Sequence, residues 1–201
     1  MFMRAMKNLR ILFAPALCVL AFFTPAHAMS VLPLYLDEMI DTAAVAFEGR
    51  VIANRSERDA ATNLVVTYTT FEVREALKGA VGSTHVTKQI GGSLPEEGLQ
   101  YRIEGIPAFT VGEDYVVFLA GVSSAGFSSP VGLAQGRFGV KAGATGRRVS
   151  NGRDFRDMTA RISARMPDAA NALMKQSREP VRDMDLDEFK QTVRNHLAGA
   201  R

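Results

Sequence analysis

His85, Glu113 and Asp114 carry the side chains of this sequence that most directly suggest acid–base chemistry. An imidazole and a carboxylate that meet in one cleft can act as general base and general acid. The three residues are scattered along the chain, so only the fold could assemble them into a site. His85 alternates with Thr87 and Gln89 along an expected strand, and we predict that this face points to solvent. An enzyme built from these scattered residues is therefore an alternative hypothesis.

Metal chemistry has weaker support. The run Asp183–Asp187 begins like a calcium-binding loop, but its sixth position is Glu188, where such a loop needs Gly, and its twelfth is Arg194, where it needs Glu. Helix capping explains these carboxylates better. His196 lies near the end of the last expected helix, where the helix dipole favours a cation at the surface. We predict no metal ligand.

Nucleophilic, glycosidic and nucleotide-binding motifs do not fit either. The turn Gly91–Ser93 lacks the Gly-x-Ser-x-Gly spacing of a nucleophile elbow. Glu96 and Glu97 are adjacent in a loop, whereas glycosidase carboxylates must face one sugar from separate positions. The run Gly136–Gly139 opens no helix and lacks phosphate-loop spacing. We therefore predict no catalytic residue and no cofactor.

Charge divides the chain at residue 140. Residues 29–140 hold 8 basic and 13 acidic side chains, whereas residues 141–201 hold 13 basic and 8 acidic ones. Two interpretations stay open: the basic segment packs on the acidic domain, or it forms an arm that binds an anionic surface or polymer. The arginines that could form such an arm are Arg147, Arg148, Arg153, Arg156, Arg161 and Arg165.

The elements that must position these side chains are mostly strands. Period-two alternation and many β-branched and aromatic residues predict a mainly β fold, a small antiparallel barrel. The expected strands are Val45–Ile52, Leu64–Arg74, Thr84–Ile90, Ala108–Val111, Tyr115–Leu119 and Leu133–Val140. The five apolar residues of Tyr115–Leu119 indicate a central strand covered on both faces. The segments Asn54–Asn63 and Ser93–Gly105 read as polar loops.

Helices flank the expected barrel. Leu34–Ala44 has one apolar face, and Asp185 with Glu188 three residues later forms a capping box for a final helix at Leu186–Leu197. Phe155–Met166 and Pro167–Gln176 also have helical patterns. We predict a barrel domain at 29–140, then a basic connector at Gly143–Gly152 and a helical extension within 141–201 that packs on the barrel.

The barrel prediction specifies a core. One face of each strand contributes apolar residues that we expect to be buried together, with the helix at Leu34–Ala44 and the final helix packed outside. These core residues are Phe47, Val51, Phe71, Val73, Val117 and Phe138.

The first 28 residues have the pattern of a secretory signal peptide. Arg4, Lys7 and Arg10 precede the apolar run Ile11–Phe23, and a small-x-small site places cleavage between Ala28 and Met29. The apolar run is shorter than the about 20 residues that a membrane-spanning helix needs. We expect an exported protein, periplasmic or secreted, without a membrane span after cleavage. Cys18 is the sole cysteine and lies in this segment, so the exported chain has no disulfide.

Four stretches resemble a group of uncharacterised exported bacterial proteins with an OB-type barrel, similar to the netrin-like domain of metalloproteinase inhibitors. They are Thr67–Val73 with Leu77–Gly79, Gln89–Gly92, Ile106–Phe109 with Val111–Leu119, and Gly132–Phe138. The resemblance implies a fold, and it carries no catalytic residue. The inhibitors use a cysteine at the mature N-terminus, which this chain lacks.

The sequence therefore favours an exported, non-catalytic binding or assembly domain with a protein partner and no nucleic acid. The chain without its first 28 residues is formally neutral, which removes the general attraction to nucleic acid. We expect the sheet edges and the loop Ser93–Gly105 to form the contact surface.

Overall fold

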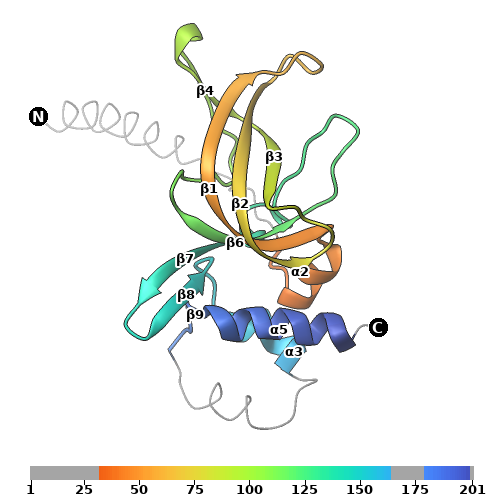
Figure 1. Cartoon of the computed structure of the whole chain (residues 1–201), viewed down its shortest axis with the longest axis vertical. Helices are drawn as coiled ribbons and strands as arrows, with labels where there is room; N and C mark the ends of the chain where they lie inside the picture. The colour runs from red at the N-terminus through yellow and green to blue at the C-terminus, as the bar shows by residue number, and fades with distance from the viewer. Residues whose placement is uncertain (1–31, 164–178, 200–201) are drawn as a thin grey trace, which may run out of the picture. The chain divides into compact units, whose positions relative to one another are not determined.

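The computed structural model of this protein describes residues 32–163 and 179–199 (Figure 1). Residues Pro33–Arg201 form one compact unit, to which the described elements belong. The predicted signal peptide with its Ala28–Met29 cleavage site, Arg165 and the helix expected at Pro167–Gln176 lie outside the described residues.

The fold is mainly β, as the alternation predicts. Seven antiparallel strands form one sheet in the order β3-β2-β1-β6-β7-β8-β9, and β4 pairs only with β5. The strands are β1 Val45–Arg58, β2 Val65–Lys78, β3 Thr84–Ile90, β4 Gly92–Leu94, β5 Leu99–Tyr101, β6 Asp114–Leu119, β7 Arg137–Gly143, β8 Gly146–Ser150 and β9 Met184–Asp185.

The sheet does not close into the expected barrel. Closure would require its two edge strands, β3 and β9, to pair with each other. β9 has only two residues and leads directly into the helix Leu186–Gly199, and among the described residues it pairs with β8 and not with β3.

Several expected boundaries were wrong. β1 continues to Arg58 through the polar segment predicted as a loop, because Arg58 still pairs with Val65 of β2. Ala108–Val111 is not a strand, and the start of the expected last strand, Leu133–Gly136, is a 3-10 turn. The expected connector at Gly143–Gly152 contains β8, which pairs with β7.

Three described helices accompany the sheet: α2 Leu36–Thr42, α3 Phe155–Ser163 and α5 Leu186–Gly199. Asp185 caps α5 as predicted, because its Oδ1 accepts hydrogen bonds from the backbone N–H groups of Asp187 and Glu188 at 2.9 and 3.2 Å. In Figure 1, α3 and α5 lie against the β6–β8 end of the sheet, near α2.

One hydrophobic cluster joins these helices to the sheet. Phe118 of β6 and Phe189 of α5 have ring centroids 6.2 Å apart, and both side chains are fully buried. The cluster also contains Leu36, Met39, Ile40, Phe138, Phe155 and Val193. The prediction that the first and last helices pack against the sheet is confirmed.

A second cluster covers the opposite face of the sheet, and it contains four of the predicted core residues. Phe47, Val51, Phe71 and Val117 are buried there, and the half-buried Val73 packs against them. Phe138 was misplaced. It pairs with Val116, and paired residues point to the same face, so Phe138 joins the helix-side cluster. Tyr115–Leu119 is buried on both faces, as predicted.

Candidate functional site

A cavity of about 260 Å³ lies between β1–β3 and the chain segment that follows β3. Its polar lining residues include Asn54, Ser56, Thr67, Thr69, Gln89 and Gln100. Its apolar and aromatic lining residues include Ile90, Tyr101, Ile103, Ile106, Pro107 and Phe109. The lining is thus a mixture of neutral hydrogen-bonding groups and apolar surface, the composition typical of a small-ligand site.

Two glycines shape this cavity by turning the chain back over the sheet. Gly91 and Gly92 have φ angles of 102° and 149°, which residues other than glycine rarely adopt. A Cβ atom at Gly92 would lie 2.5 Å from Thr67 Oγ1 and 2.6 Å from Ser56 Oγ. The β4–β5 hairpin can therefore approach β1 and β2 only because residue 92 has no side chain.

Hydrogen bonds hold the walls of the cavity together without a ligand. Thr67 Oγ1 donates to the carbonyl of Gly91 at 2.7 Å and lies 2.9 Å from Ser56 Oγ. Asn54 Nδ2 donates to the carbonyl of Phe109 at 2.7 Å. The sheet thus fixes both ends of the covering segment, so the cavity is largely preformed.

Gln89 is the unusual residue of the cavity. Its side chain lies in the cavity lining with only 5 % of the residue exposed, and its Nε2 has no hydrogen-bond partner among the described residues. A buried donor without a partner costs about 1–3 kcal/mol. Sequence reasoning placed Gln89 and Thr87 on a solvent-facing side, which was wrong, because both residues are buried.

Among the described residues that line the cavity, Arg102 is the only charged one. It is exposed, and within residues 32–163 and 179–199 no carboxylate forms an ion pair with it. The cavity therefore carries one positive charge near its exposed side and neutral groups elsewhere. The expected polar loop Ser93–Gly105 supplies this arginine, and it folds as the β4–β5 hairpin with an intervening 3-10 turn at Pro95–Glu97.

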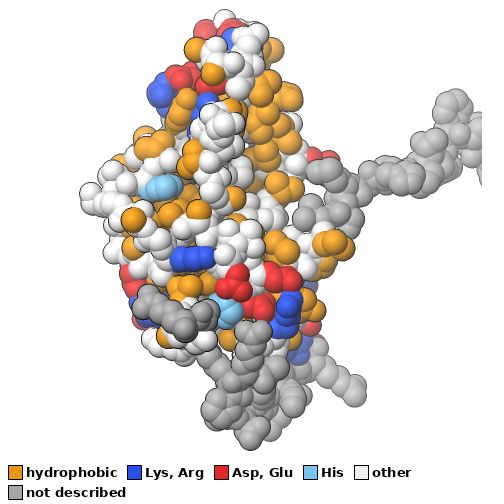
Figure 2. Space-filling model, turned by 90° about the vertical axis from the view of Figure 1, so that its right-hand side faces the viewer, with side chains coloured by type: hydrophobic (Ala, Val, Ile, Leu, Met, Phe, Trp, Pro, Cys, Tyr) orange, Lys and Arg blue, Asp and Glu red, His pale blue; other side chains and the backbone are white. Residues whose placement is uncertain are grey.

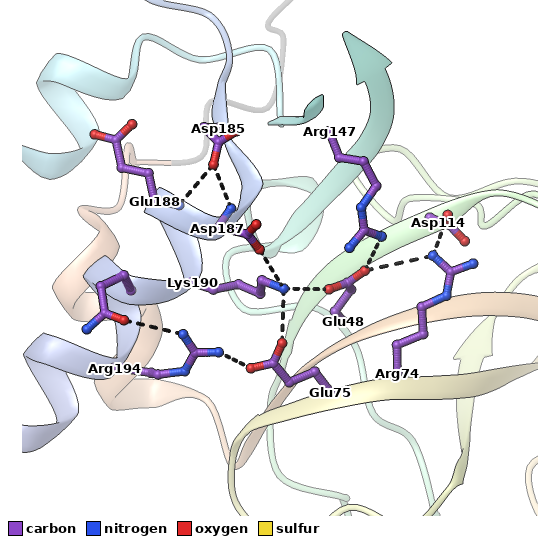
Figure 3. A network of polar contacts seen from close by, with 11 residues as sticks. Glu48, Arg74, Glu75, Asp114, Arg147, Asp185, Asp187, Glu188, Lys190 and Arg194 are labelled. Atoms are coloured by element: carbon purple, nitrogen blue, oxygen red, sulfur yellow. Dashed lines mark hydrogen bonds and ion pairs between the residues drawn. The ribbon is translucent and has the colours of Figure 1, made fainter. Parts of the chain in front are cut away.

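His85, Glu113 and Asp114 do not form one site. His85 pairs with Phe71 and its ring lies 5.1 Å from that of Phe47, on the face of the second cluster. Asp114 alternates with Tyr115 and faces the other side of the sheet, where Arg74 Nη1 lies 2.8 Å from its Oδ2 (Figure 3). The alternative hypothesis of an enzyme therefore loses the only set of catalytic residues that was named for it.

His85 is half-buried, which corrects the expectation that it faces solvent. Burial lowers the pKa of its imidazole below the ordinary value, so the ring is held in its neutral form. His196 also differs from the expected surface residue: its side chain is 6 % exposed, and its Nε2 lies 2.8 Å from Asp41 Oδ1.

The described arginines of the expected basic arm contact groups of the same chain. Arg147 Nη1 lies 2.5 Å from Glu48, and Arg148 Nη2 lies 2.6 Å from Asp183. The partners of the others are Gln135 and the Leu34 carbonyl for Arg153, Asp154 for Arg156, and Asp37 and Glu38 for Arg161. These contacts favour the intramolecular interpretation of the charge division.

Glu48 lies at the centre of this charge network (Figure 3). Its side chain is 2 % exposed and its carboxylate contacts Arg147 of β8 and Lys190 of α5, the latter at 3.0 Å. Lys190 Nζ also lies 3.0 Å from Glu75, which in turn pairs with Arg194. The network therefore ties α5 to β1, β2 and β8.

The pKa values of Glu75 and Lys190 are shifted in the directions that keep both groups charged. Burial raises the pKa of Glu75, but hydrogen bonds from Lys190 and Arg194 outweigh burial and hold it below its ordinary value. Burial lowers the pKa of Lys190, but its bonds to Glu75 and Glu48 outweigh burial and raise it. Both groups stay charged at neutral pH, which suits a structural tie better than proton transfer.

Two further features bear on function. Within the described residues, no group of three or more His, Cys, Asp or Glu side chains could hold a metal ion. No described helix has the length and apolar character needed to cross a membrane.

Figure 2 shows apolar side chains gathered on the upper part of one face, the end that carries the β1–β2 turn and the β4–β5 hairpin. Exposed apolar residues of these turns are Leu64, Leu99 and Tyr101.

A comparison with known proteins finds no matching family model, no matching curated protein and no matching solved structure.

Proposed function

We propose that this protein is an exported, non-catalytic binding module that holds its ligand in the cavity between β1–β3 and the β4–β5 hairpin. The cavity supports the proposal because it combines apolar walls with hydrogen-bonding groups and is fixed by bonds within the chain. Such preformed cavities bind with little loss of conformational entropy.

Gln89 carries the proposal. A sequence selected for stability alone would place an apolar residue at this buried position, because the unpartnered Nε2 costs free energy. The Nε2 atom has almost no accessible surface, so a ligand oxygen would reach it once the Gln89 side chain turns toward the cavity, and that contact would recover the cost. The strained or unsatisfied positions of a fold are often the ones that function requires.

Export is part of the proposal and rests on the pattern of residues 1–28. Expression of the full chain in a bacterium, followed by N-terminal sequencing of the product outside the cytoplasm, should give Met29 as the first residue. A product that stays in the cytoplasm with its first 28 residues would contradict export without affecting the cavity. The relation to OB-type exported proteins, suggested by stretches such as Thr67–Val73, is likewise a proposal.

The variant Gln89→Met tests the binding function. Met keeps the length of the side chain and removes the unpartnered amide, so the free energy of unfolding should rise by about 1 kcal/mol or stay unchanged. The same change should weaken binding of small carboxylic acids, amides and sugars, observed as shifts of the ¹H–¹⁵N signals of Gly91, Gly92 and Ile103.

Gln191→Met on the exposed side of α5 is the matched control, and it should leave both measurements unchanged. The proposal fails if no probe shifts the cavity signals of the unaltered protein. It also fails if Gln89→Met is clearly destabilising while binding persists, because Gln89 would then have a purely structural role.

A further inference from the structure

The charge of the cavity limits which ligands it can accept, an argument that rests on the proposed binding function. Arg102 contributes the only charge of the lining that the structure describes, and it forms no ion pair with the described residues. A ligand that covers Arg102 removes water from its guanidinium, and an anionic group of the ligand offsets that loss better than a neutral acceptor does. A carboxylate does so with two parallel hydrogen bonds to the guanidinium.

Two side-chain amides add a second constraint. Asn54 uses its Nδ2 in the bond to the Phe109 carbonyl, so its Oδ1 is left as an acceptor. Gln89 supplies an amide whose Nε2 lacks a partner and has almost no accessible surface, so the side chain must turn before this donor faces a ligand. A ligand that offers both a donor and an acceptor satisfies both residues, and a peptide group has one of each.

The remaining walls and the volume set the size of the ligand. Ile90, Ile103, Ile106 and Pro107 offer apolar surface to a hydrocarbon side chain. The volume of about 260 Å³ is below the roughly 300 Å³ at which pockets for drug-sized ligands begin. A dinucleotide or another large cofactor is therefore too big, whereas one residue with its carboxylate and one amide group is of suitable size.

We propose that the cavity binds an α-amido carboxylate with an apolar side chain, which is the chemistry of an N-acylated amino acid and of a peptide's C-terminal residue. Arg102 binds the carboxylate, the Gln89 side chain turns toward the cavity and donates to the amide carbonyl, Asn54 accepts from the amide N–H, and the isoleucines contact the side chain.

The test compares two probes that differ only in charge. N-acetyl-leucine has the carboxylate, and N-acetyl-leucinamide replaces it with a neutral amide. Dissociation constants come from the ¹H–¹⁵N side-chain signals of Gln89 and Arg102 in the full chain as purified. Because hydrogen bonds to charged groups are the stronger ones, the acid should bind about ten- to a hundredfold more tightly than the amide.

Two variants localise the effect. Arg102→Gln should abolish the preference, so that acid and amide bind with similar dissociation constants. Arg55→Gln removes an exposed arginine of β1 that lies outside the cavity lining, and it should keep the preference. An acetylated tripeptide ending in leucine separates the two sources, because tighter binding than N-acetyl-leucine indicates a peptide terminus and equal binding indicates a small free acid.

Each contrary outcome is informative. Equal binding of acid and amide to the unaltered protein overturns the ligand class but leaves the cavity as a binding site. A preference that persists in a folded Arg102→Gln variant overturns the role of Arg102 and the proposed class. If neither probe shifts the signals at millimolar concentrations, the ligand class is wrong, and the broader probe set described above decides the binding function separately.

Discussion

Replacing Lys190 by Met tests how the final helix is held to the sheet. Lys190 projects from α5, its side chain is 7 % exposed, and its Nζ lies 3.0 Å from Glu48, 3.0 Å from Glu75 and 3.1 Å from Asp187 (Figure 3). Met has a similar length and fills the same space, so the substitution mainly removes the charge.

The size of the effect follows from the burial of the partners. Removing one member of a buried ion pair costs about 3–5 kcal/mol, because the other member is left as an uncompensated charge. Glu48 keeps Arg147 at 2.5 Å and Arg74 at 3.8 Å, and Glu75 keeps Arg194. We therefore expect the low end of that range, about 3 kcal/mol, which is a large share of the about 5–15 kcal/mol of a typical domain.

Urea unfolding followed by circular dichroism measures this loss. Lys141→Met is the matched control, since Lys141 is exposed on β7 and forms no ion pair with the described residues; it should change the free energy of unfolding by no more than about 0.5 kcal/mol. The double variant Glu48→Gln with Lys190→Met should cost less than the sum of the single variants, because the two side chains interact. Equal effects of Lys190→Met and Lys141→Met would refute the reasoning.

Two further predictions concern the opposite face of the sheet. Phe71→Ala should lower the free energy of unfolding by about 3–5 kcal/mol, because Phe71 is fully buried with ring centroids 5.4 Å from Phe47 and 5.0 Å from Phe109; a urea midpoint close to that of the unaltered protein would contradict the packing. The lowered pKa of His85 means that its contribution to stability is complete above the unfolded value of about 6.5 and is lost as pH falls toward the folded value. The melting temperature of His85→Gln should therefore fall less between about pH 7.5 and 5.5 than that of the unaltered protein, and identical pH profiles would exclude this effect.

The positions of strands and helices could be predicted from the sequence where burial of one face imposes a strict period on the apolar residues. The alternation around Phe71 and the continuous apolar run Tyr115–Leu119 both gave the correct element and the correct buried residues. The capping role of Asp185 was also readable, because a cap depends on neighbouring residues alone. Polar strands were not readable: the far end of β1 is stabilised by pairing with β2, which no local pattern reveals.

The candidate cavity could not be predicted from the sequence. Gln89 sits in a polar alternation that is typical of a solvent-facing strand, yet the folded-back segment after Gly91 covers it. Arg102 lies in a stretch that reads as an ordinary loop, and only the path of that loop brings it to the cavity that Gln89 lines. Neither Gln89 nor Arg102 belongs to a sequence motif with a fixed spacing that would have marked it as a cavity residue.

The amino-acid sequence by itself determined the mainly β class, the apolar faces of the central strands and the expectation of export, because each depends on periodicity or composition within a short stretch. Tertiary structure decided which of the two hydrophobic clusters each strand residue joins. It also decided that the sheet stays open and where the unpartnered amide lies. Those outcomes depend on pairing between distant segments, such as Phe138 with Val116. A residue's neighbours along the chain do not specify its neighbours across the sheet. The cavity is lined by residues of distant chain segments that become neighbours across the sheet and its covering segment.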